Sequence, residues 1–366
     1  MADDKKPFSA LRVALLTSAR TWRGSCVSLA SLARGLVNRG HKAVLLVGEA
    51  SIAEAAADYG IPVVVLPTRN TGLTEIQALR RVLVERDIQI LIADRPRDHR
   101  LGAMASVGRK TALVYRYNVS RPRPPSDLVT RLALRRTAMT VFRTATGAAQ
   151  VLARAPFMNR RPHAVITGGI DTAAYYPDAE AGEEFRRTYS LGEKPFLLAV
   201  GALVPEKRYP EMFASVAALS PRIPLVICGV GRQEQELREL ASRLEIEVRL
   251  LGLLSGARLR GAYAATAMLI HTCVVETFGL SVAEAMACGC PVIVVGGGAM
   301  TEVVGTAGVV VSSDRPDAFT AAIEDMMQNP EKRFLLGLAA KARSQACFSL
   351  EQVVDNYERL LVELGA

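Results

Sequence analysis

The stretch His271–Gly305, with the sequence HTCVVETFGLSVAEAMACGCPVIVVGGGAMTEVVG, contains the pattern that decides the fold. It is typical of a strand end, a loop, a helix, a second strand, a glycine loop and the start of another helix. Two carboxylates, Glu276 and Glu284, stand in its first half with seven residues between them. Short apolar strands that alternate with helices predict a parallel sheet with its ligands at the carboxyl ends of the strands.

The segment between the two carboxylates predicts a helix N-terminus. Ser281 is the expected N-cap, and Val282–Cys288 has a helical composition. The first N–H groups of a helix and the positive end of its dipole suit a phosphate. Glu284 lies about one turn into this helix, on the side that faces its N-terminus. The pattern therefore predicts a pocket for a molecule that carries both hydroxyl and phosphate groups.

This stretch closely resembles the E-x7-E signature of retaining GT-B glycosyltransferases of family 4, the "glycosyl transferases group 1" type. That family includes sucrose synthases, mannosyltransferases and lipopolysaccharide glucosyltransferases. The resemblance implies that Glu276 contacts the donor sugar as the catalytic residue, and that Glu284 contacts the nucleotide ribose. It also assigns four residues between them to the donor site: Phe278, Gly279, Leu280 and Ser281.

The N-terminal half is predicted to be a doubly wound sheet of its own. Leu11–Thr17 and Lys42–Val47 have the composition of buried strands, with a helix over Cys26–Arg39 between them. Arg39-Gly40-His41 and the loop at Gly24 resemble the opening of the same family, which implies that Gly24 approaches the donor phosphate. Further strands are expected at Pro62–Leu66, Ile88–Ala93, Ala112–Tyr115 and Met139–Phe142.

The loops after two of these strands contain the candidate contacts to an acceptor. Where many family members have a histidine after the strand equivalent to Ala112–Tyr115, this chain has arginine, tyrosine and asparagine. His99, in the preceding loop, is interpreted as no more than a surface histidine. The departure leaves the acceptor contacts open, and the candidates are Arg95, Arg97, His99, Arg116, Tyr117 and Asn118.

In the C-terminal half, Lys207 matches the lysine of the family pattern Gly-Arg-x-x-x-x-Lys, which implies that it neutralises the donor pyrophosphate. Ala202 stands where that pattern has arginine. A charge-assisted hydrogen bond contributes roughly 1.5–3 kcal/mol, so its loss would weaken donor binding unless another group compensates. Arg208, where the family has glycine, is the local candidate for that compensation. Leu253 matches a position near the nucleotide base.

The net charge of +9 is concentrated in one part of the chain. Between Asp94 and Arg161 there are 15 Lys and Arg against 3 acidic residues. This basic belt predicts an anionic acceptor or an anionic membrane surface, and a solvated face is the alternative. Nucleic acid is not expected, because few aromatic residues are interleaved with the arginines and no binding motif is present.

The length of 366 residues predicts two domains. The resemblance implies their bounds and roles: 1–169 on the acceptor side, 170–347 for the donor, and a terminal helix, 348–366, crossing back to the first domain. No signal peptide or spanning segment is expected, which favours the cytoplasm, with peripheral contact at the inner face of the membrane as an option. Six scattered cysteines are interpreted as buried thiols in a reducing compartment, and Cys288-Gly-Cys290 as no metal site. No metal and no cofactor are predicted.

Together with the resemblance, these features predict an α/β protein of two Rossmann-like, doubly wound parallel-sheet domains facing a central cleft, the GT-B fold. The predicted function is metal-independent, retaining transfer of a sugar from a nucleotide-sugar donor, with UDP or GDP as the nucleotide. The acceptor is a hydroxyl of a glycolipid, polysaccharide or other cell-envelope molecule. A catalytically degenerate binding or partner subunit, and a nucleotide-sugar epimerase or hydrolase, remain as alternatives.

Overall fold

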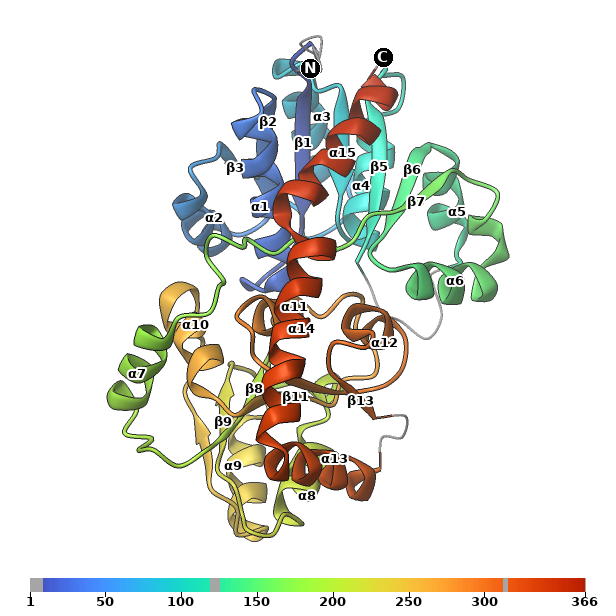
Figure 1. Ribbon diagram of the computed structural model, residues 1–366. Coiled ribbons are helices and arrows are strands. Elements are labelled where there is room, and N and C mark those ends of the chain that lie inside the picture. The colour runs from blue at the N-terminus through green and yellow to red at the C-terminus, as the bar shows by residue number, and fades with distance from the viewer. Residues whose placement is uncertain (1–8, 119–125, 312–314, 366) are drawn as a thin grey trace. The chain divides into compact units, whose positions relative to one another are not determined.

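The computed structural model describes residues 9–118, 126–311 and 315–365. The chain divides into two compact units. Unit 1 contains Met1–Gly169 and Leu350–Ala366, and unit 2 contains Ile170–Ser349. Each unit is a parallel sheet with helices on both faces (Figure 1). The chain therefore has the predicted α/β class, with one doubly wound sheet per unit.

Unit 1 is built on a seven-stranded sheet in the order β3-β2-β1-β4-β5-β6-β7. Its strands are β1 Arg12–Thr17, β2 Lys42–Val47, β3 Val63–Val65, β4 Ile90–Ala93, β5 Ala112–Tyr117, β6 Thr137–Phe142 and β7 His163–Val165. Its helices are α1 Gly24–Asn38, α2 Ala50–Ala56, α3 Leu73–Glu85, α4 Pro96–Ala105, α5 Leu128–Arg135, α6 Ala145–Arg154 and α15 Leu350–Gly365. The 3-10 turns η1 Ala57–Tyr59 and η2 Pro156–Met158 complete the unit.

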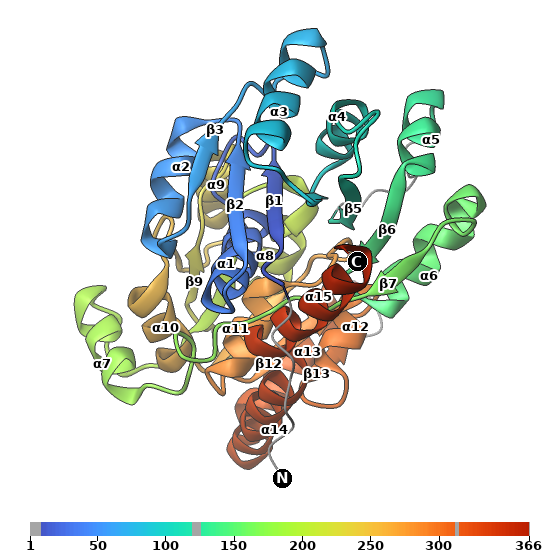
Figure 2. The same ribbon diagram turned by 90° about the horizontal axis from the view of Figure 1, so that it is seen from above.

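Two apolar clusters cover the two faces of this sheet. One cluster joins the sheet to α1, α2 and α15, and the other joins it to α3, α4 and α5 (Figure 2). The central strands are buried on both sides, which explains why β1 and β2 read as continuous apolar runs rather than as alternating patterns.

Helix α15 belongs to unit 1 although it ends the chain, because its apolar face packs on α1. Its buried residues lie on one face of the helix: Val353, Val354, Tyr357, Leu360 and Leu361. His41 fixes the helix to the sheet. Its Nδ1 accepts from the Leu11 amide at 3.2 Å, which leaves Nε2 to donate to Glu358 at 2.9 Å. Arg39 adds an ion pair with Glu358 at 2.7 Å.

Unit 2 is built on a six-stranded sheet in the order β10-β9-β8-β11-β12-β13. Its strands are β8 Leu197–Val200, β9 Leu225–Cys228, β10 Val248–Leu250, β11 Met268–His271, β12 Val292–Val295 and β13 Val309–Val311. Its helices are α7 Ala179–Thr188, α8 Tyr209–Ala217, α9 Glu234–Arg243, α10 Gly256–Ala265, α11 Leu280–Ala287, α12 Ala299–Val304, α13 Pro316–Gln328 and α14 Pro330–Phe348, with the 3-10 turn η3 Pro205–Lys207.

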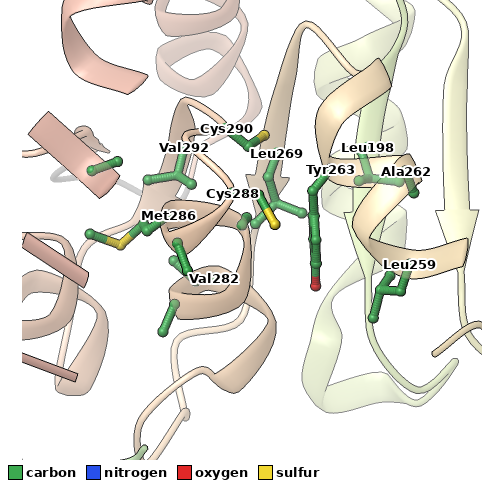
Figure 3. Close-up of a cluster of buried hydrophobic side chains, with 14 of the residues drawn as sticks. Leu198, Leu259, Ala262, Tyr263, Leu269, Val282, Met286, Cys288, Cys290 and Val292 are labelled. Atoms are coloured by element: carbon green, nitrogen blue, oxygen red, sulfur yellow. The ribbon is translucent and has the colours of Figure 1, made fainter. Parts of the chain in front are cut away.

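The helices of unit 2 also divide between two faces. Helices α8, α9 and α13 bury their apolar residues against one face. Helices α7, α10, α11, α12 and α14 cover the other. Figure 3 shows part of this second cluster, in which Tyr263 of α10 lies beside Leu269 of β11 and Cys288 at the end of α11.

Several expectations about local structure were wrong. The segment after β4 is a loop only as far as Arg95, because Pro96 begins α4. Strand β5 continues to Tyr117, so Arg116 and Tyr117 lie in a strand and not in the loop after it. The N-cap of α11 is Gly279 and not Ser281, since a left-handed residue at φ 85° turns the chain into the helix.

The close approach of α1 and α15 predicts a measurable coupling between Gly35 and Val354. A Cβ on Gly35 would overlap the Val354 side chain. Gly35→Ala gains about 1 kcal/mol in helix propensity, but overpacking costs about 1–3 kcal/mol, so we expect a net loss of stability. Combining it with Val354→Ala removes the overlap, and the double-mutant cycle should give a favourable coupling of about 1 kcal/mol in urea unfolding. Strictly additive effects would contradict this packing.

Candidate functional site

The candidate site lies at the carboxyl edge of the sheet of unit 2. The strand order reverses between β8 and β11, and the loops after these two strands diverge there. Such a switch point is where doubly wound sheets bind ligands. The loop after β8 leads to Lys207, and the loop after β11 leads to Glu276. The topology therefore brings together two residues that are 69 positions apart.

Lys207 and Glu276 form a direct, hydrogen-bonded ion pair. Gly201 makes room for it, since a Cβ there would lie 3.1 Å from Cε of Lys207. Burial raises the pKa of Glu276, but Lys207 and His271 more than reverse this effect and hold it below its ordinary value. Burial also lowers the pKa of His271, whose Nε2 lies 3.5 Å from Oε1 of Glu276. Glu276 is therefore an ionised acceptor for hydroxyl groups.

Thr272 holds the turn that presents Lys207. Its hydroxyl lies 2.8 Å from the carbonyl of Lys207 and 3.1 Å from that of Arg208. Arg208 has a left-handed backbone, with φ 57° and ψ 43°, which glycine adopts without strain and arginine does not. Its side chain donates to Glu211 at 2.9 Å. The structure thus places Arg208 directly beside Lys207, in a pair with Glu211.

The N-terminus of α11 lies just beyond Glu276 in the chain. Gly279 is buried, and its left-handed backbone favours glycine, whereas a Cβ there would meet only the flexible end of Met300. The first backbone bond at this end runs from the Val282 amide to the Gly279 carbonyl at 3.1 Å. The amides of Leu280 and Ser281 precede it, as expected for donors available to an anion. Phe278 is a core residue that packs edge-on against Phe348.

Glu284 is buried and accepts a hydrogen bond from the Tyr263 hydroxyl at 3.0 Å. Burial raises the pKa of Glu284 to about 8, although this hydrogen bond acts in the opposite direction. The carboxyl group is therefore mostly protonated at neutral pH, in contrast with Glu276. A ligand whose hydroxyls donate to Glu284 would favour its ionised form.

Three functional candidates were missed by sequence reasoning. Tyr263 lies in an ordinary helical segment, and nothing in its surroundings distinguishes it from a core residue. His271 and Thr272 stand at the start of the decisive stretch, but only the fold shows that they contact Glu276 and the Lys207 turn. His271 and Thr272 form a polar pair at the end of an apolar strand, and this pair is the feature of the sequence that could have pointed to them.

Two further donor candidates lie elsewhere. Leu253 follows β10, beyond Gly252, and is 61% exposed. Gly24 is in unit 1, where it begins α1 with Arg23 as the N-cap. The roles of both residues at the donor site stay predictions.

The six acceptor-side candidates separate into accessible and buried residues. Arg95, Arg97 and Asn118 are partly exposed. Arg116 and Tyr117 are buried in β5.

His99 is also buried, which corrects its interpretation as a surface histidine. It stacks on Tyr115 at 4.1 Å and lies 2.7 Å from the Thr137 hydroxyl. That hydroxyl donates to the Ala133 carbonyl, so His99 is the donor in their bond. Burial lowers the pKa of His99 to about 3, which makes it a neutral core residue.

The arginines of the basic belt also separate into buried and exposed residues. Arg116 donates to Ser28 at 2.9 Å, and its Nε lies 3.5 Å from the buried Asp94. Arg143 is buried beside them, and burial lowers its pKa to about 9. Other belt arginines are exposed on or near α5, including Arg131 and Arg135. Arg121 and Arg123 lie outside the described residues.

Comparison with known proteins identifies the domain in unit 2. Residues 182–343 match the family model described as glycosyl transferases group 1. This segment is a glycosyl transferases group 1 domain. The predicted resemblance to the glycosyl transferases group 1 type is thereby confirmed for this segment, which contains Glu276, Glu284 and Lys207.

Relatives of known activity match part of the chain. A GDP-mannose-dependent alpha-(1-6)-phosphatidylinositol monomannoside mannosyltransferase of Mycolicibacterium smegmatis is 29% identical over 187 residues, 47% of this chain and 49% of that protein. The O-antigen chain mannosyltransferase B of Escherichia coli is 30% identical over 183 residues, 47% and 48% of the two chains. The chain thus spans about half the length of these curated relatives.

Solved structures match nearly the whole chain and show its fold. Anabaena HepE in complex with UDP-glucose gives a TM-score of 0.86 at 19% identity, over 96% of this chain and 100% of that one. Sucrose-phosphate synthase of Thermosynechococcus elongatus gives a TM-score of 0.82 at 19% identity, over 97% and 99%. The glycosyl transferases group 1 domain and unit 1 together have the GT-B fold.

The buried carboxyl group of Glu284 predicts a specific pH dependence of stability. Its folded pKa, about 8, lies above the ordinary 4.5, so the folded chain holds a proton that the unfolded chain loses. Its contribution to stability is therefore complete below pH 4.5 and is lost as the pH rises to about 8. Glu284→Gln removes this loss.

The measurement is urea unfolding of both proteins at pH 5 and pH 8. Between these values the wild type should lose at least about 1.4 kcal/mol more stability than Glu284→Gln, the equivalent of one pKa unit. Glu193→Gln, an exposed loop position, serves as the matched control. Equal pH dependence in wild type and Glu284→Gln would show that Glu284 ionises normally in the folded chain.

Proposed function

We propose that the chain is a retaining glycosyltransferase that needs no divalent metal and transfers a hexose from a nucleoside-diphosphate donor to a hydroxyl acceptor. The observation that supports this most strongly is the arrangement at the switch point of unit 2. There, a cation on Lys207, an ionised carboxylate on Glu276 and the N-terminus of α11 converge from separate elements. A nucleotide sugar carries the complementary groups, namely pyrophosphate and sugar hydroxyls.

Each of these residues has a distinct role in the proposed reaction. Lys207 and the amides of Leu280 and Ser281 bind the pyrophosphate and stabilise the negative charge that develops on it as it leaves. Glu276 accepts hydrogen bonds from the sugar hydroxyls and orients the anomeric carbon. Glu284, held by Tyr263, accepts from the ribose.

The bond changes in this reaction balance without a further reactant. The acceptor oxygen forms a bond to the anomeric carbon, and the bond from that carbon to the phosphate oxygen breaks. The acceptor proton passes to the leaving phosphate, so the protein need not supply a base. Lys207 and the helix N-terminus take the electrostatic role that a metal ion has in other enzymes.

The relatives favour GDP-mannose as the donor and a cell-envelope lipid as the acceptor. Both proteins named above are mannosyltransferases, and one of them uses GDP-mannose to form an alpha linkage on a phosphatidylinositol mannoside. The mannose of GDP-mannose is itself alpha-linked, so an alpha product means retention. The HepE structure contains UDP-glucose, which keeps UDP as the second nucleotide to test.

Binding of the free nucleotides tests the donor site directly. We expect GDP or UDP, and not both equally, to raise the thermal midpoint of the wild type. Lys207→Gln should weaken that binding about 10- to 100-fold, since it removes one charge-assisted contact. Lys194→Gln, an exposed loop position in the same unit, should bind like the wild type. No stabilisation by any nucleotide would favour the degenerate-subunit alternative.

We also propose that unit 1 binds an anionic membrane surface through α5. Leu128 and Leu132 are one helical turn apart and are 71% and 48% exposed. Arg131 and Arg135 occupy the same outer side of the helix and are exposed. Between residues 126 and 165 the chain has seven arginines and a single acid, Asp127. Exposed leucines that alternate with arginines suit the headgroup region of an anionic bilayer.

None of the helices within the described residues is long and apolar enough to cross a bilayer. Vesicle sedimentation with phosphatidylglycerol in phosphatidylcholine therefore tests surface binding. Arg131→Gln with Arg135→Gln should reduce binding about 30-fold, at about 1 kcal/mol per arginine, and high salt should do the same. Leu128→Ser with Leu132→Ser should also release the protein, whereas the exposed Leu73→Ser in α3 should not. Salt-independent binding would contradict the electrostatic attraction.

A further inference from the structure

The residues around Glu276 have a second property that the proposed reaction does not use. His271, Cys273 and Glu276 each point one potential metal-binding atom into the same small volume, and these three atoms lie within 4.8 Å of one another. Within the described ranges this is the one such grouping of histidine, cysteine and acidic residues. The grouping contains three different donor types, which are imidazole nitrogen, thiolate sulfur and carboxylate oxygen.

The local backbone explains why the three side chains meet. His271 is the last residue of β11, and Cys273 follows two residues later. In an extended chain, residues two apart project to the same side. The turn toward α11 then returns Glu276 to that side, so that its Oε1 lies 3.5 Å from Nε2 of His271.

An unsatisfied buried atom points to a ligand at this place. Nε2 of His271 is buried, and the Glu276 carboxylate oxygen 3.5 Å away is beyond the usual hydrogen-bond length, so this atom has no close hydrogen-bond partner among the residues that the structure describes. Buried polar atoms are nearly always paired, so one that faces a thiol and a carboxylate calls for an explanation. The grouping already attracts a cation, because the ammonium of Lys207 is bound to Glu276.

We propose that His271, Cys273 and Glu276 bind a thiophilic divalent cation, best matched by Zn²⁺, and that this cation inhibits the protein by displacing Lys207 from Glu276. Tetrahedral zinc holds neighbouring N, O and S ligands about 3.3–3.6 Å apart. The present spacing closes to these values with movements of about 1 Å, which ordinary side-chain rotation provides. The softer sulfur and nitrogen ligands favour Zn²⁺ over Mg²⁺ or Ca²⁺.

The chemistry of binding balances without an oxidant or reductant. Cys273 loses its thiol proton to solvent as the sulfur–zinc bond forms, and the imidazole binds in its neutral form. Lys207 keeps its proton and turns toward solvent, where 21% of its side chain is already exposed. Three protein ligands leave the fourth zinc position to water.

Inhibition rests on the proposed function, but zinc binding does not. Glu276 cannot hold zinc and the sugar hydroxyls at once, so zinc should compete with the donor. The binding experiment therefore uses the whole chain without nucleotide, and a separate assay measures sugar transfer. If zinc binds but no transfer occurs in its absence, the proposed function fails and the site stands.

Calorimetry with ZnCl₂ and absorption with Co²⁺ test the site. We expect one tight site per chain and a sulfur-to-cobalt charge-transfer band. Cys273→Ser should remove the band and weaken zinc binding at least about tenfold, because it deletes the thiolate ligand. The matched control is Cys26→Ser, which changes an equally buried thiol in unit 1 and should leave both signals unchanged. A band or affinity that survives Cys273→Ser would overturn the site.

Lys207→Gln gives a second, independent test that does not require Cys273→Ser to fold. Without its competing ammonium, zinc should bind about tenfold more tightly, whereas the nucleotide should bind more weakly. A merely damaged site would weaken both ligands. Zinc affinity that is unchanged or reduced in Lys207→Gln would overturn the proposed displacement.

Discussion

The ion pair between Lys207 and Glu276 is the interaction on which the candidate site depends. Both charges are partly withdrawn from water, a cost that only a close partner offsets. The fold supplies that partner through the strand order, since β8 and β11 are neighbours although their loops are far apart in sequence. The pair keeps Glu276 ionised and holds Lys207 in place. A donor then meets both charges already positioned, which reduces the ordering that binding would otherwise require.

The turn between Lys207 and α8 shows how this chain tolerates an unusual residue. Arg208 adopts a left-handed conformation that costs an arginine about 1–2 kcal/mol. Thr272 offsets this by contacting two carbonyls of the turn, and Glu211 holds the guanidinium. Strained residues that the surrounding structure holds in place cluster at functional sites, which makes Arg208 a candidate for a role at this turn. Because the guanidinium is paired with Glu211, compensation for Ala202 would require it to leave this partner, and that role stays a prediction.

Much of the fold could be predicted from the sequence, because its signals are local. Apolar runs such as Lys42–Val47 predicted their strands. The family signature predicted Glu276, Glu284 and Lys207 as residues of the donor site. What could not be predicted depends on contacts between distant residues. Nothing near Glu284 in the sequence shows that Tyr263 donates to it, and nothing near His271 reveals its contact with Glu276.

Errors in the first half have a related cause. A proline after two charged residues reads as a loop, yet Pro96 is favoured at the first turn of a helix, where it begins α4. The predicted strand ends at Tyr115, two residues before the end of β5, and the residue that follows is the charged Arg116. Arginine is seldom fully buried, so its burial can be predicted only when the residues that pair with it are known. Those partners are Asp94 and Ser28, from two other elements.

The burial of Arg116 with Asp94 also affects which arginines can bind an anionic acceptor. Asp94 is inaccessible, and neither of its oxygens has a hydrogen-bond partner among the described residues, so its charge depends on the guanidinium of Arg116 at 3.5 Å. An arginine committed in this way cannot turn to an anionic ligand without leaving a buried carboxylate unpaired, which is strongly unfavourable. Within the part of the chain that the structure describes, Arg95 and Arg97 form no such ion pair, and both are partly exposed at the start of α4. An anionic acceptor is therefore expected to interact with these two arginines rather than with Arg116.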